Sequence, residues 1–287
     1  MALKEVKPQD FVERSNLRGF AVLLFDWAAI FGVIGLSIWI NNWVVYLISV
    51  WVIGSFQYAI GESLLHEASH YNLFKTKKLN DYLEFFYGYP FFVDMRQYRE
   101  EHTNHHYKMG SDLDHIVHDY EIHGLNKTPK NIFWLWFIKP VIGYGGYFYV
   151  RYAIHLYPVK SALKFLAFWA PIISVFLYFD MFHYLVLYWF VPFLWCFSSF
   201  LYWAEISEHF NAKSGSRSDL GFLKNFFHHN GGYHYIHHTY PTIPWYNLPK
   251  AHNSLCPPGT DIAYGFLDVY RQLGVDHSKE KTNSKYQ

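Results

Sequence analysis

Four apolar stretches, each long enough to cross a membrane as a helix, alternate with polar segments along the chain. They cover approximately residues 20–40, 43–65, 162–179 and 183–206. A helix needs about 20 largely apolar residues to span the hydrocarbon core. Only a few residues separate the two stretches of each pair, at Asn41-Asn42 and at Asp180-Met181. The pattern therefore predicts two helical hairpins in an all-α integral membrane protein with four transmembrane helices.

A further apolar stretch, residues 131–150, is interrupted by Lys139-Pro140 and by three glycines. We expect it to lie at the membrane interface, because a fifth crossing would place the two termini on opposite sides of the membrane. Asp26 and Pro171 interrupt the spans themselves, and such residues are tolerated where they face protein rather than lipid. The apolar pattern by itself also fits core helices of a soluble protein, and this alternative stays open at this point.

Lysine and arginine are unevenly distributed. Neither occurs between Arg18 and Lys75 or between Lys164 and Lys213, so both expected hairpin turns lack basic residues. Cytoplasmic loops close to a membrane are enriched in these residues. The asymmetry predicts that the hairpin turns lie outside the cell and that both termini lie in the cytoplasm. We expect residues 1–287 to form a single membrane domain.

The composition narrows the classes of function. Hydrophobic residues make up 52% of the chain and aromatic residues 22%, which suits a protein with much of its surface at a membrane interface. The formal net charge of +1 gives no indication of a nucleic-acid partner. Cys196 and Cys256 cannot by themselves form a disulfide framework or a cysteine-ligated zinc site.

Histidine is concentrated in three five-residue boxes, HEASH at 66–70, HTNHH at 102–106 and HYIHH at 234–238. On a helix, residues three or four apart share a face, so each box can direct several imidazoles at one place. Imidazole binds zinc, copper, iron and nickel, and the boxes hold more imidazoles than the three or so ligands of a catalytic zinc. They therefore suit two metal ions. The box histidines are His66, His70, His102, His105, His106, His234, His237 and His238.

The order of boxes and spans resembles that of the membrane-bound fatty acid desaturases and related hydroxylases. That family has the boxes H-x-x-x-H, H-x-x-H-H and H-x-x-H-H on a cytoplasmic helical cap of a four-span bundle. The resemblance covers about residues 60–252 and includes the flanking segments YREEHTNHH and YHYIHHTYPTIPWYNLPKAH. It implies a non-haem di-iron centre with a ninth ligand near the end of the fourth span, which is His209 here. Some members have asparagine four residues before this histidine, where this chain has Glu205.

The resemblance also implies an O2-dependent oxidoreductase with two iron ions as its cofactor. We expect desaturation of a fatty acyl or similar lipid-like chain, and hydroxylation or ketone formation on a lipid or terpenoid is the alternative. Both reactions need two electrons supplied from outside. Because the chain has no haem-binding signature, we expect a separate donor of the ferredoxin or cytochrome b5 type. The ends of the second and fourth spans are expected to line a substrate channel, with Tyr58, Leu65, Tyr202 and Trp203 as candidates.

The first box also matches the zinc-protease pattern His-Glu-x-x-His, in which Glu67 would act as the general base. This is the least favoured alternative, because it leaves the other six box histidines unused. In the di-iron interpretation, four acidic residues near the candidate ligands either support a ligand or contact solvent. They are Glu67, Glu101, Asp112 and Glu205.

The remaining histidines near the boxes carry weaker signals. His228 and His229 are left unassigned, because Gly231-Gly232 interrupts the helical spacing between them and the third box. Three others fall in a polar segment and are expected at the surface. These are His115, His118 and His123.

Overall fold

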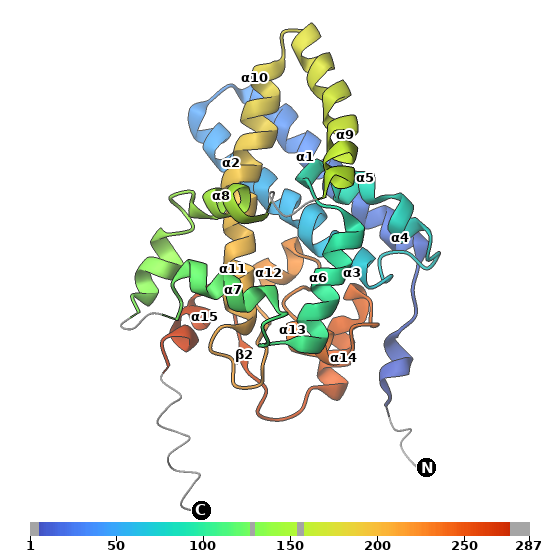
Figure 1. Cartoon of the computed structure of the whole chain (residues 1–287), viewed down its shortest axis with the longest axis vertical. Helices are drawn as coiled ribbons and strands as arrows, with labels where there is room; N and C mark the ends of the chain where they lie inside the picture. Colours follow the sequence, from blue (N-terminus) through green and yellow to red (C-terminus); the bar gives the residue numbers. More distant parts are fainter. Residues whose placement is uncertain (1–5, 127–129, 154–157, 276–287) are drawn as a thin grey trace, which may run out of the picture.

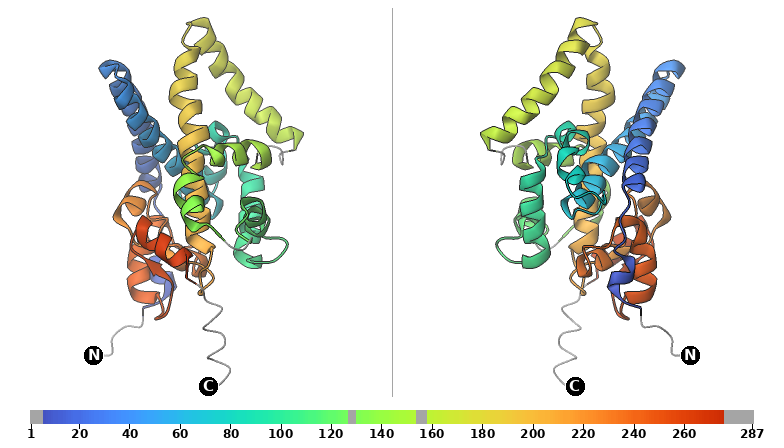
Figure 2. Two further views of the ribbon diagram at one scale, coloured as in Figure 1. Left: turned by 90° about the vertical axis from the view of Figure 1, so that its left-hand side faces the viewer. Right: turned by 90° about the vertical axis from the view of Figure 1, so that its right-hand side faces the viewer.

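The computed structural model describes residues 6–126, 130–153 and 158–275. It confirms the all-α architecture, with four helical runs that are long and apolar enough to cross a membrane. These runs are Asn16–Ile40, Trp43–Ser69, Val159–Tyr178 and Phe182–His209. The two hairpin turns lie at one end of the molecule, and the short helices of the cap gather at the other end (Figure 1). The two hairpins lean apart toward their turns (Figure 2).

The first hairpin consists of α1 (Asn16–Ile40) and α2 (Trp43–Tyr58), and two asparagines make its turn. Asn41 ends α1 in the left-handed region with φ of 48°, a conformation that asparagine adopts more readily than most residues. The side chain of Asn42 accepts hydrogen bonds from the backbone N–H of Val44 and Val45, at 2.9 and 3.3 Å, and caps α2. The two asparagines therefore reverse the chain between two apolar helices and cap the start of the second helix.

The second span continues from α2 through the π-helical segment η2 (Ala59–Leu64) into α3 (Leu65–Ser69). A π turn holds more residues than an α turn, and it rotates the residues that follow it relative to a regular α-helix. The segment η2 ends just before His66. This local irregularity therefore determines the face of the helix on which the first histidine box lies.

The second and fourth spans form the centre of the bundle. In the most apolar window of each span, 61% of the second and 50% of the fourth are buried, against 28% of the first and 17% of the third. Gly54 of α2 lies directly against Cys196, where any side chain at Gly54 would collide. The fourth span comprises α10 (Phe182–Leu185), η7 (Val186–Phe190), η8 (Phe193–Phe197) and α11 (Ser198–His209), and α9 (Val159–Tyr178) is the third span.

The cap consists of short helices that precede, separate and follow the hairpins. Before the first span lies η1 (Pro8–Phe11). Between the hairpins lie α4 (Leu79–Tyr82), α5 (Glu84–Tyr87), η3 (Tyr89–Phe91), α6 (Met95–Lys108), α7 (His115–His123), η4 (Trp134–Ile138), α8 (Tyr144–Phe148) and η5 (Tyr149–Ala153). After the fourth span lie β1 (Ser218–Asp219), α12 (Phe222–Phe227), α13 (His234–Thr239), η9 (Trp245–Asn247), α14 (Leu248–Leu255), β2 (Ile262–Ala263) and α15 (Phe266–Leu273).

Two features of the cap fix its parts to one another and to the bundle. Strands β1 and β2 pair in parallel, with Ser218 opposite Ile262, and so join the two ends of the last segment of the chain. The stretch 131–150 forms η4 and α8 instead of a long helix. In α8, Gly146 lies against the backbone carbonyl of Leu194, so the cap contacts the fourth span backbone to backbone.

Candidate metal centre

Helix α6 carries the second histidine box, and Asp94 fixes its position. One carboxylate oxygen of Asp94 accepts hydrogen bonds from the backbone N–H of Arg96 and Gln97, at 3.1 and 3.4 Å, and so caps the helix. The other oxygen accepts hydrogen bonds from Lys164 at 2.7 Å and Ser161 at 3.1 Å. Because both of these residues belong to α9, a single side chain begins α6 and ties it to the third span.

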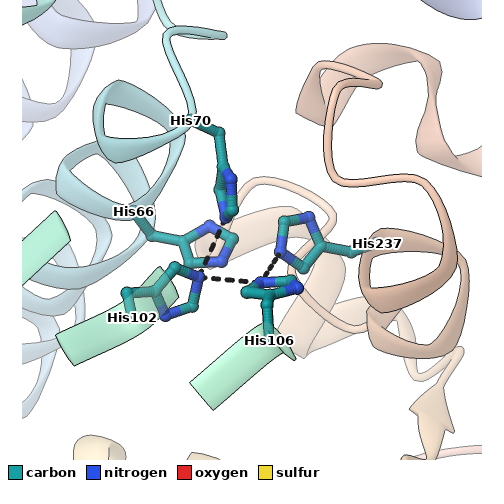
Figure 3. Close-up of side chains that lie close together, drawn as sticks. All are labelled: His66, His70, His102, His106 and His237. Atoms are coloured by element: carbon teal, nitrogen blue, oxygen red, sulfur yellow. Dashed lines mark hydrogen bonds between the residues drawn. The ribbon is translucent and has the colours of Figure 1, made fainter. Parts of the chain in front are cut away.

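Five imidazoles from all three boxes converge in the first group of histidines (Figure 3). They are His66 and His70 at the end of the second span, His102 and His106 on α6, and His237 on α13. One ring nitrogen from each lies within 4.8 Å of all the others. The Nε2 atoms of His70 and His102 are 2.9 Å apart, as are those of His102 and His106, and the Nε2 atoms of His106 and His237 are 3.0 Å apart.

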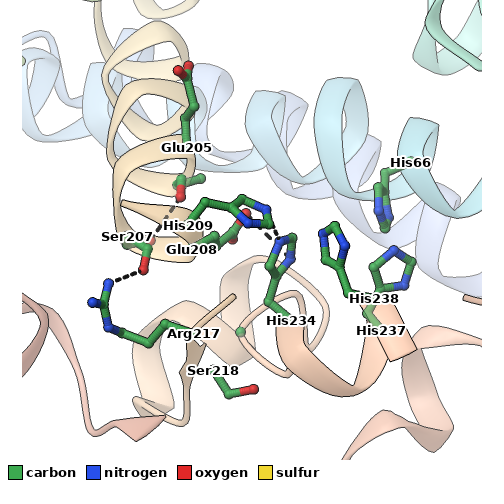
Figure 4. Close-up of polar contacts among 12 residues, drawn as sticks. His66, Glu205, Ser207, Glu208, His209, Arg217, Ser218, His234, His237 and His238 are labelled. Atoms are coloured by element: carbon green, nitrogen blue, oxygen red, sulfur yellow. Dashed lines mark hydrogen bonds and ion pairs between the residues drawn. The ribbon is translucent and has the colours of Figure 1, made fainter. Parts of the chain in front are cut away.

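The second group consists of His105, His209, His234 and His238, and Figure 4 shows three of them at the end of α11 and on α13. The Nε2 atom of His209 lies 3.0 Å from that of His105 and 2.7 Å from that of His234. The Nε2 atoms of His105 and His238 are 3.3 Å apart. The two groups together contain all nine histidines that the sequence suggested as ligands, including the ninth that only the family resemblance had suggested.

Helices α6 and α13 each contribute to both groups. On each helix, the first and last histidines of the box enter one group and the remaining histidine enters the other. His102 and His106 are four residues apart and enter the first group, while His105 enters the second. On α13 the assignment is reversed, because the pair His234 and His238 enters the second group and His237 the first. Residues four apart on a helix share a face, and a residue next to one of them lies about 100° around the helix. Each box thus serves two adjacent sites.

Four candidate ligands in the cap are held in the neutral form. Burial, followed by the neighbouring imidazoles, lowers the pKa of His102, His237 and His238 well below the ordinary value. The same causes lower the pKa of His106 to about 3. A neutral imidazole keeps one ring nitrogen with a free lone pair, which is the form that binds a metal ion.

Partners on the other ring nitrogen orient several of these imidazoles. The Nδ1 atom of His105 donates to the carboxylate of Asp114 at 3.0 Å, and Nδ1 of His209 donates to the carbonyl of Gly215 at 3.1 Å. Nδ1 of His234 lies 3.5 Å from the carboxylate of Glu208. When both rings are neutral, with the protons on Nδ1 of His105 and of His209, the two Nε2 atoms present lone pairs to each other, and no hydrogen bond can join them.

The geometry of the two groups fits a metal ion at the centre of each. Lone pairs facing one another at 3.0 Å, as in His105 and His209, repel unless a cation lies between them. Imidazole nitrogens bind first-row metals at about 2.1 Å, so two ligands at right angles around one ion are about 3.0 Å apart. The shortest Nε2 separations in the two groups, 2.9 to 3.0 Å in the first and 2.7 to 3.3 Å in the second, are close to this value. The donor set, imidazole alone, suits zinc, copper, iron and nickel.

The four acidic candidates lie in different surroundings. Glu67 has one oxygen 3.9 Å from Nδ1 of His66 and accepts the backbone N–H of Trp245 at 3.0 Å with the other. Glu101 accepts a hydrogen bond from Gln97 at 2.9 Å, and an oxygen of Glu205 lies 3.6 Å from Nε2 of His123. Asp112 is exposed and, among the described residues, contacts no candidate ligand. Asp114, two residues later, is the aspartate that supports His105.

Sequence reasoning misplaced one histidine and left another without a partner. His123 was expected at the surface, but it is only 3% exposed and bonds to the hydroxyl of Tyr144 at 3.1 Å. It lies seven residues, two helical turns, after the buried Ile116, and this spacing is the signal that places it on the inner face of α7.

The histidine whose partner the sequence did not show is His229. Its Nε2 atom lies 2.7 Å from the carboxylate of Asp26 in the first span, and both residues are buried.

A cavity of about 250 Å³ adjoins both groups of histidines. The second and fourth spans, α6, α7 and the segment before α13 form its walls, and the lining includes histidines of both groups. Of the four residues expected to line a substrate channel, Tyr58 lines this cavity and Leu65, Tyr202 and Trp203 do not. The cavity therefore lies at the ends of the second and fourth spans, where the sequence places the channel, but of the four expected side chains it shares Tyr58 alone.

Comparison with known proteins agrees with this geometry. A model of the fatty acid desaturase family matches residues 41–265, more than three quarters of the chain. Dihydrorhizobitoxine desaturase from Bradyrhizobium elkanii is 24% identical over 281 aligned positions, which cover 87% of this chain and 76% of that protein. A beta-carotene ketolase from a Paracoccus species is 46% identical over 44 residues, 15% of this chain and 18% of the ketolase. The chain belongs to the fatty acid desaturase family.

Proposed function

We propose that this protein is an O2-dependent desaturase that holds two non-haem iron ions in its two groups of histidines. The observation that carries the proposal is the convergence of nine imidazoles into two adjacent groups beside one cavity, in a chain of the desaturase family. When bound, two iron ions with O2 and two electrons supply an oxidant that can remove hydrogen from an unactivated C–H bond. A fatty acyl or similar lipid-like chain is the proposed substrate.

The residues of the chain supply ligands, orientation and enclosure. Asp114 and the carbonyl of Gly215 hold the rings of His105 and His209 with their lone pairs directed inward. The cavity brings a bound carbon close to both groups, since its lining includes His66 of the first group and His209 of the second. Helices on several sides of the cavity limit the contact of this carbon with bulk water, which would favour the intended reaction over side reactions.

Hydroxylation or ketone formation is the second candidate. The 44-residue match to a ketolase supports it, because these reactions use the same kind of site. A zinc protease is the third, and the geometry disfavours it. The two histidines of the His-Glu-x-x-His pattern share their group with three further imidazoles, whereas a catalytic zinc keeps a coordination position open for water.

Metal and product analysis of the purified full-length chain tests the proposal. We expect about two iron ions per chain and, with O2 and a reducing system, a product two hydrogens lighter than the substrate. A product one oxygen heavier would favour the hydroxylase. A content of one zinc ion per chain, with no oxidised product, would rule out both. Glu67→Gln adds a check, because a protease would lose nearly all its activity with this base, whereas a desaturase would keep its ligands.

We further propose that both termini and the metal centre lie on the cytoplasmic side, with a separate ferredoxin or cytochrome b5 type protein as the electron donor. The absence of basic residues from the two hairpin turns supports this orientation. Cysteine substitution provides the test. In intact cells, an impermeant thiol reagent should label Asn42→Cys and spare Ser111→Cys. Labelling of Ser111→Cys would reverse the orientation.

A further inference from the structure

Arg217 is a buried arginine that contacts the end of the helix carrying the candidate ligand His209. Its side chain is only 1% exposed. A buried charge is costly unless its hydrogen bonds are satisfied, and among the described residues the guanidinium of Arg217 donates only to neutral oxygens. The acceptors are the backbone carbonyls of Ser207, Phe210 and Asn211 and the side-chain oxygen of Gln272.

Two of these contacts complete the last turn of α11. The final four carbonyls of a helix lack partners within the helix, and in α11 they belong to residues 206–209. Arg217 serves the two that precede His209. Its Nη1 atom donates to the carbonyl of Ser207 at 2.7 Å, and its backbone N–H donates to the carbonyl of Glu208 at 2.6 Å (Figure 4). Backbone N–H groups of the residues that follow reach the other two carbonyls.

The end of α11 needs this support because His209 is the last residue of the helix. Helix ends fray, and a ligand on a frayed turn would lose its direction. The segment that contains Arg217 also holds the ring, since Nδ1 of His209 donates to the carbonyl of Gly215 at 3.1 Å. Backbone and imidazole of this ligand are therefore fixed by one short stretch of chain.

The residue after Arg217 holds the start of α13, which carries the third histidine box. The hydroxyl of Ser218, which is fully buried, accepts the backbone N–H of Tyr235 at 3.1 Å in the first turn of α13. Two adjacent residues thus join the end of α11 to the start of α13. Those helix ends bring His209 and His234 together, with 2.7 Å between their Nε2 atoms.

Helix α15 fixes the orientation of the guanidinium. Oε1 of Gln272 accepts a hydrogen bond from Nε of Arg217 at 2.8 Å, and Nε2 of Gln272 donates to the carbonyl of Ile262 at 2.8 Å. Ile262 is the residue opposite Ser218 in the two-stranded sheet. The planar guanidinium is therefore held from both sides, by α15 and by the carbonyls of α11.

We propose that Arg217 is a positioning residue for the second group of histidines, because it holds the last turn of α11 with Nε2 of His209 directed at the other imidazoles. The inference rests on the proposed function, since it requires a metal ion in that group. It also predicts a sign. A positive charge repels a nearby metal ion, so loss of the charge alone would strengthen metal binding, whereas loss of the positioning weakens it.

Titration of the metal-free, full-length protein with Co2+ tests the inference. Co2+ lies next to Fe2+ in the affinity order of first-row ions, and its visible absorption reports the geometry of its ligands. We expect Arg217→Ala to lower the affinity for Co2+ at least about tenfold and to change the absorption of bound Co2+. An unchanged or increased affinity would overturn the inference.

Ile53→Ala separates positioning from general stability. Ile53 is fully buried in the second span, thirteen residues before His66, and its truncation leaves a cavity without touching a candidate ligand. Both variants are titrated at a temperature at which circular dichroism shows them folded. Ile53→Ala should melt earlier than wild type and bind Co2+ equally well. Equal Co2+ affinities of the two variants would show that Arg217 only stabilises the fold, and the inference would fail.

Gln272→Ala decides the matter if Arg217→Ala does not fold. This change removes one hydrogen bond of Arg217 and should lower the affinity for Co2+ about threefold, and an unchanged affinity would again overturn the inference. Failures of the two proposals are distinguishable. A wild-type protein that binds neither Fe2+ nor Co2+ would refute the proposed metal centre and the inference with it. Metal binding that is the same in wild type and variants would refute the inference alone.

Discussion

Asp94 combines two roles, helix cap and ion pair, that substitution can separate. Its two backbone bonds cap α6, and its bonds to Lys164 and Ser161 fix α6 to the third span. Asparagine is as good a cap as aspartate, so Asp94→Asn removes the negative charge and keeps the cap. Asp94→Ala removes both. The difference in stability between wild type and Asp94→Asn therefore measures the ion pair, and the difference between Asp94→Asn and Asp94→Ala measures the cap.

The expected magnitudes follow from exposure and geometry. Lys164 is 41% exposed, so solvent screens the ion pair, and its loss should lower the free energy of unfolding by about 0.5 to 1 kcal/mol. Loss of an N-cap costs about 1 kcal/mol more. We expect the metal-free protein, unfolded in mixed detergent micelles and followed by its helical circular dichroism, to lose about 0.5 to 1 kcal/mol in Asp94→Asn and about 2 kcal/mol in Asp94→Ala.

The pH dependence gives the sign of the charge effect. Burial works to raise the pKa of Asp94, but Lys164, Ser161 and the backbone donors outweigh it, so this pKa lies below the ordinary value. A lowered carboxyl pKa stabilises the protein above the pKa of the unfolded chain, about 3.9, and this stabilisation is lost as the pH falls through the folded value. The difference between wild type and Asp94→Asn should therefore shrink below about pH 4. A difference between wild type and Asp94→Asn that grows on acidification would refute this account. Equal stability of wild type and Asp94→Asn at pH 7 would also refute it.

Three further predictions concern the metal centre and its support. Asp114→Asn should lower the affinity for iron about tenfold, because it weakens the hydrogen bond that orients His105. The assay measures how much iron each protein retains against a chelator, and Asp112→Asn, at an exposed position, is the control. Equal retention of iron by the two variants would contradict the role of Asp114. Asp26→Ala should lower the free energy of unfolding by about 1 to 3 kcal/mol, because it leaves His229 buried without its partner; Asp26→Asn should lose less, and identical melting of wild type and alanine variant would refute the pairing. Removal of iron should lower the apparent melting temperature, since metal binds the folded chain; unchanged melting after verified removal would show that the ions do not stabilise the cap.

The spans and the convergence of the candidate histidines could be predicted because their signals are local. An apolar run of about 20 residues indicates a membrane helix by its length, and the turn at Asn41-Asn42 follows from the asparagines that make it. The boxes stand out because histidines three and four apart must share a helix face. For these features, neighbouring residues contain all the information that is needed.

The rest depends on contacts between distant parts of the chain. The hydrogen bond between Asp26 and His229 joins residues 203 apart, and no local pattern marks either one as the partner of the other. The division of box two between the two groups depends on how α6 is rotated against α13, which is a matter of tertiary packing.

The alternating assignment of α6 and α13 to the two groups of histidines makes the groups mechanically dependent. A turn of α6 about its axis that moves His102 and His106 in the first group must also move His105 in the second. The same holds for His237 and the pair on α13. An ion in one group fixes the rotation of both helices, and this rotation arranges the ligands of the other group in advance. We therefore expect the two ions to bind cooperatively, so that half-loaded protein is scarce at every metal concentration.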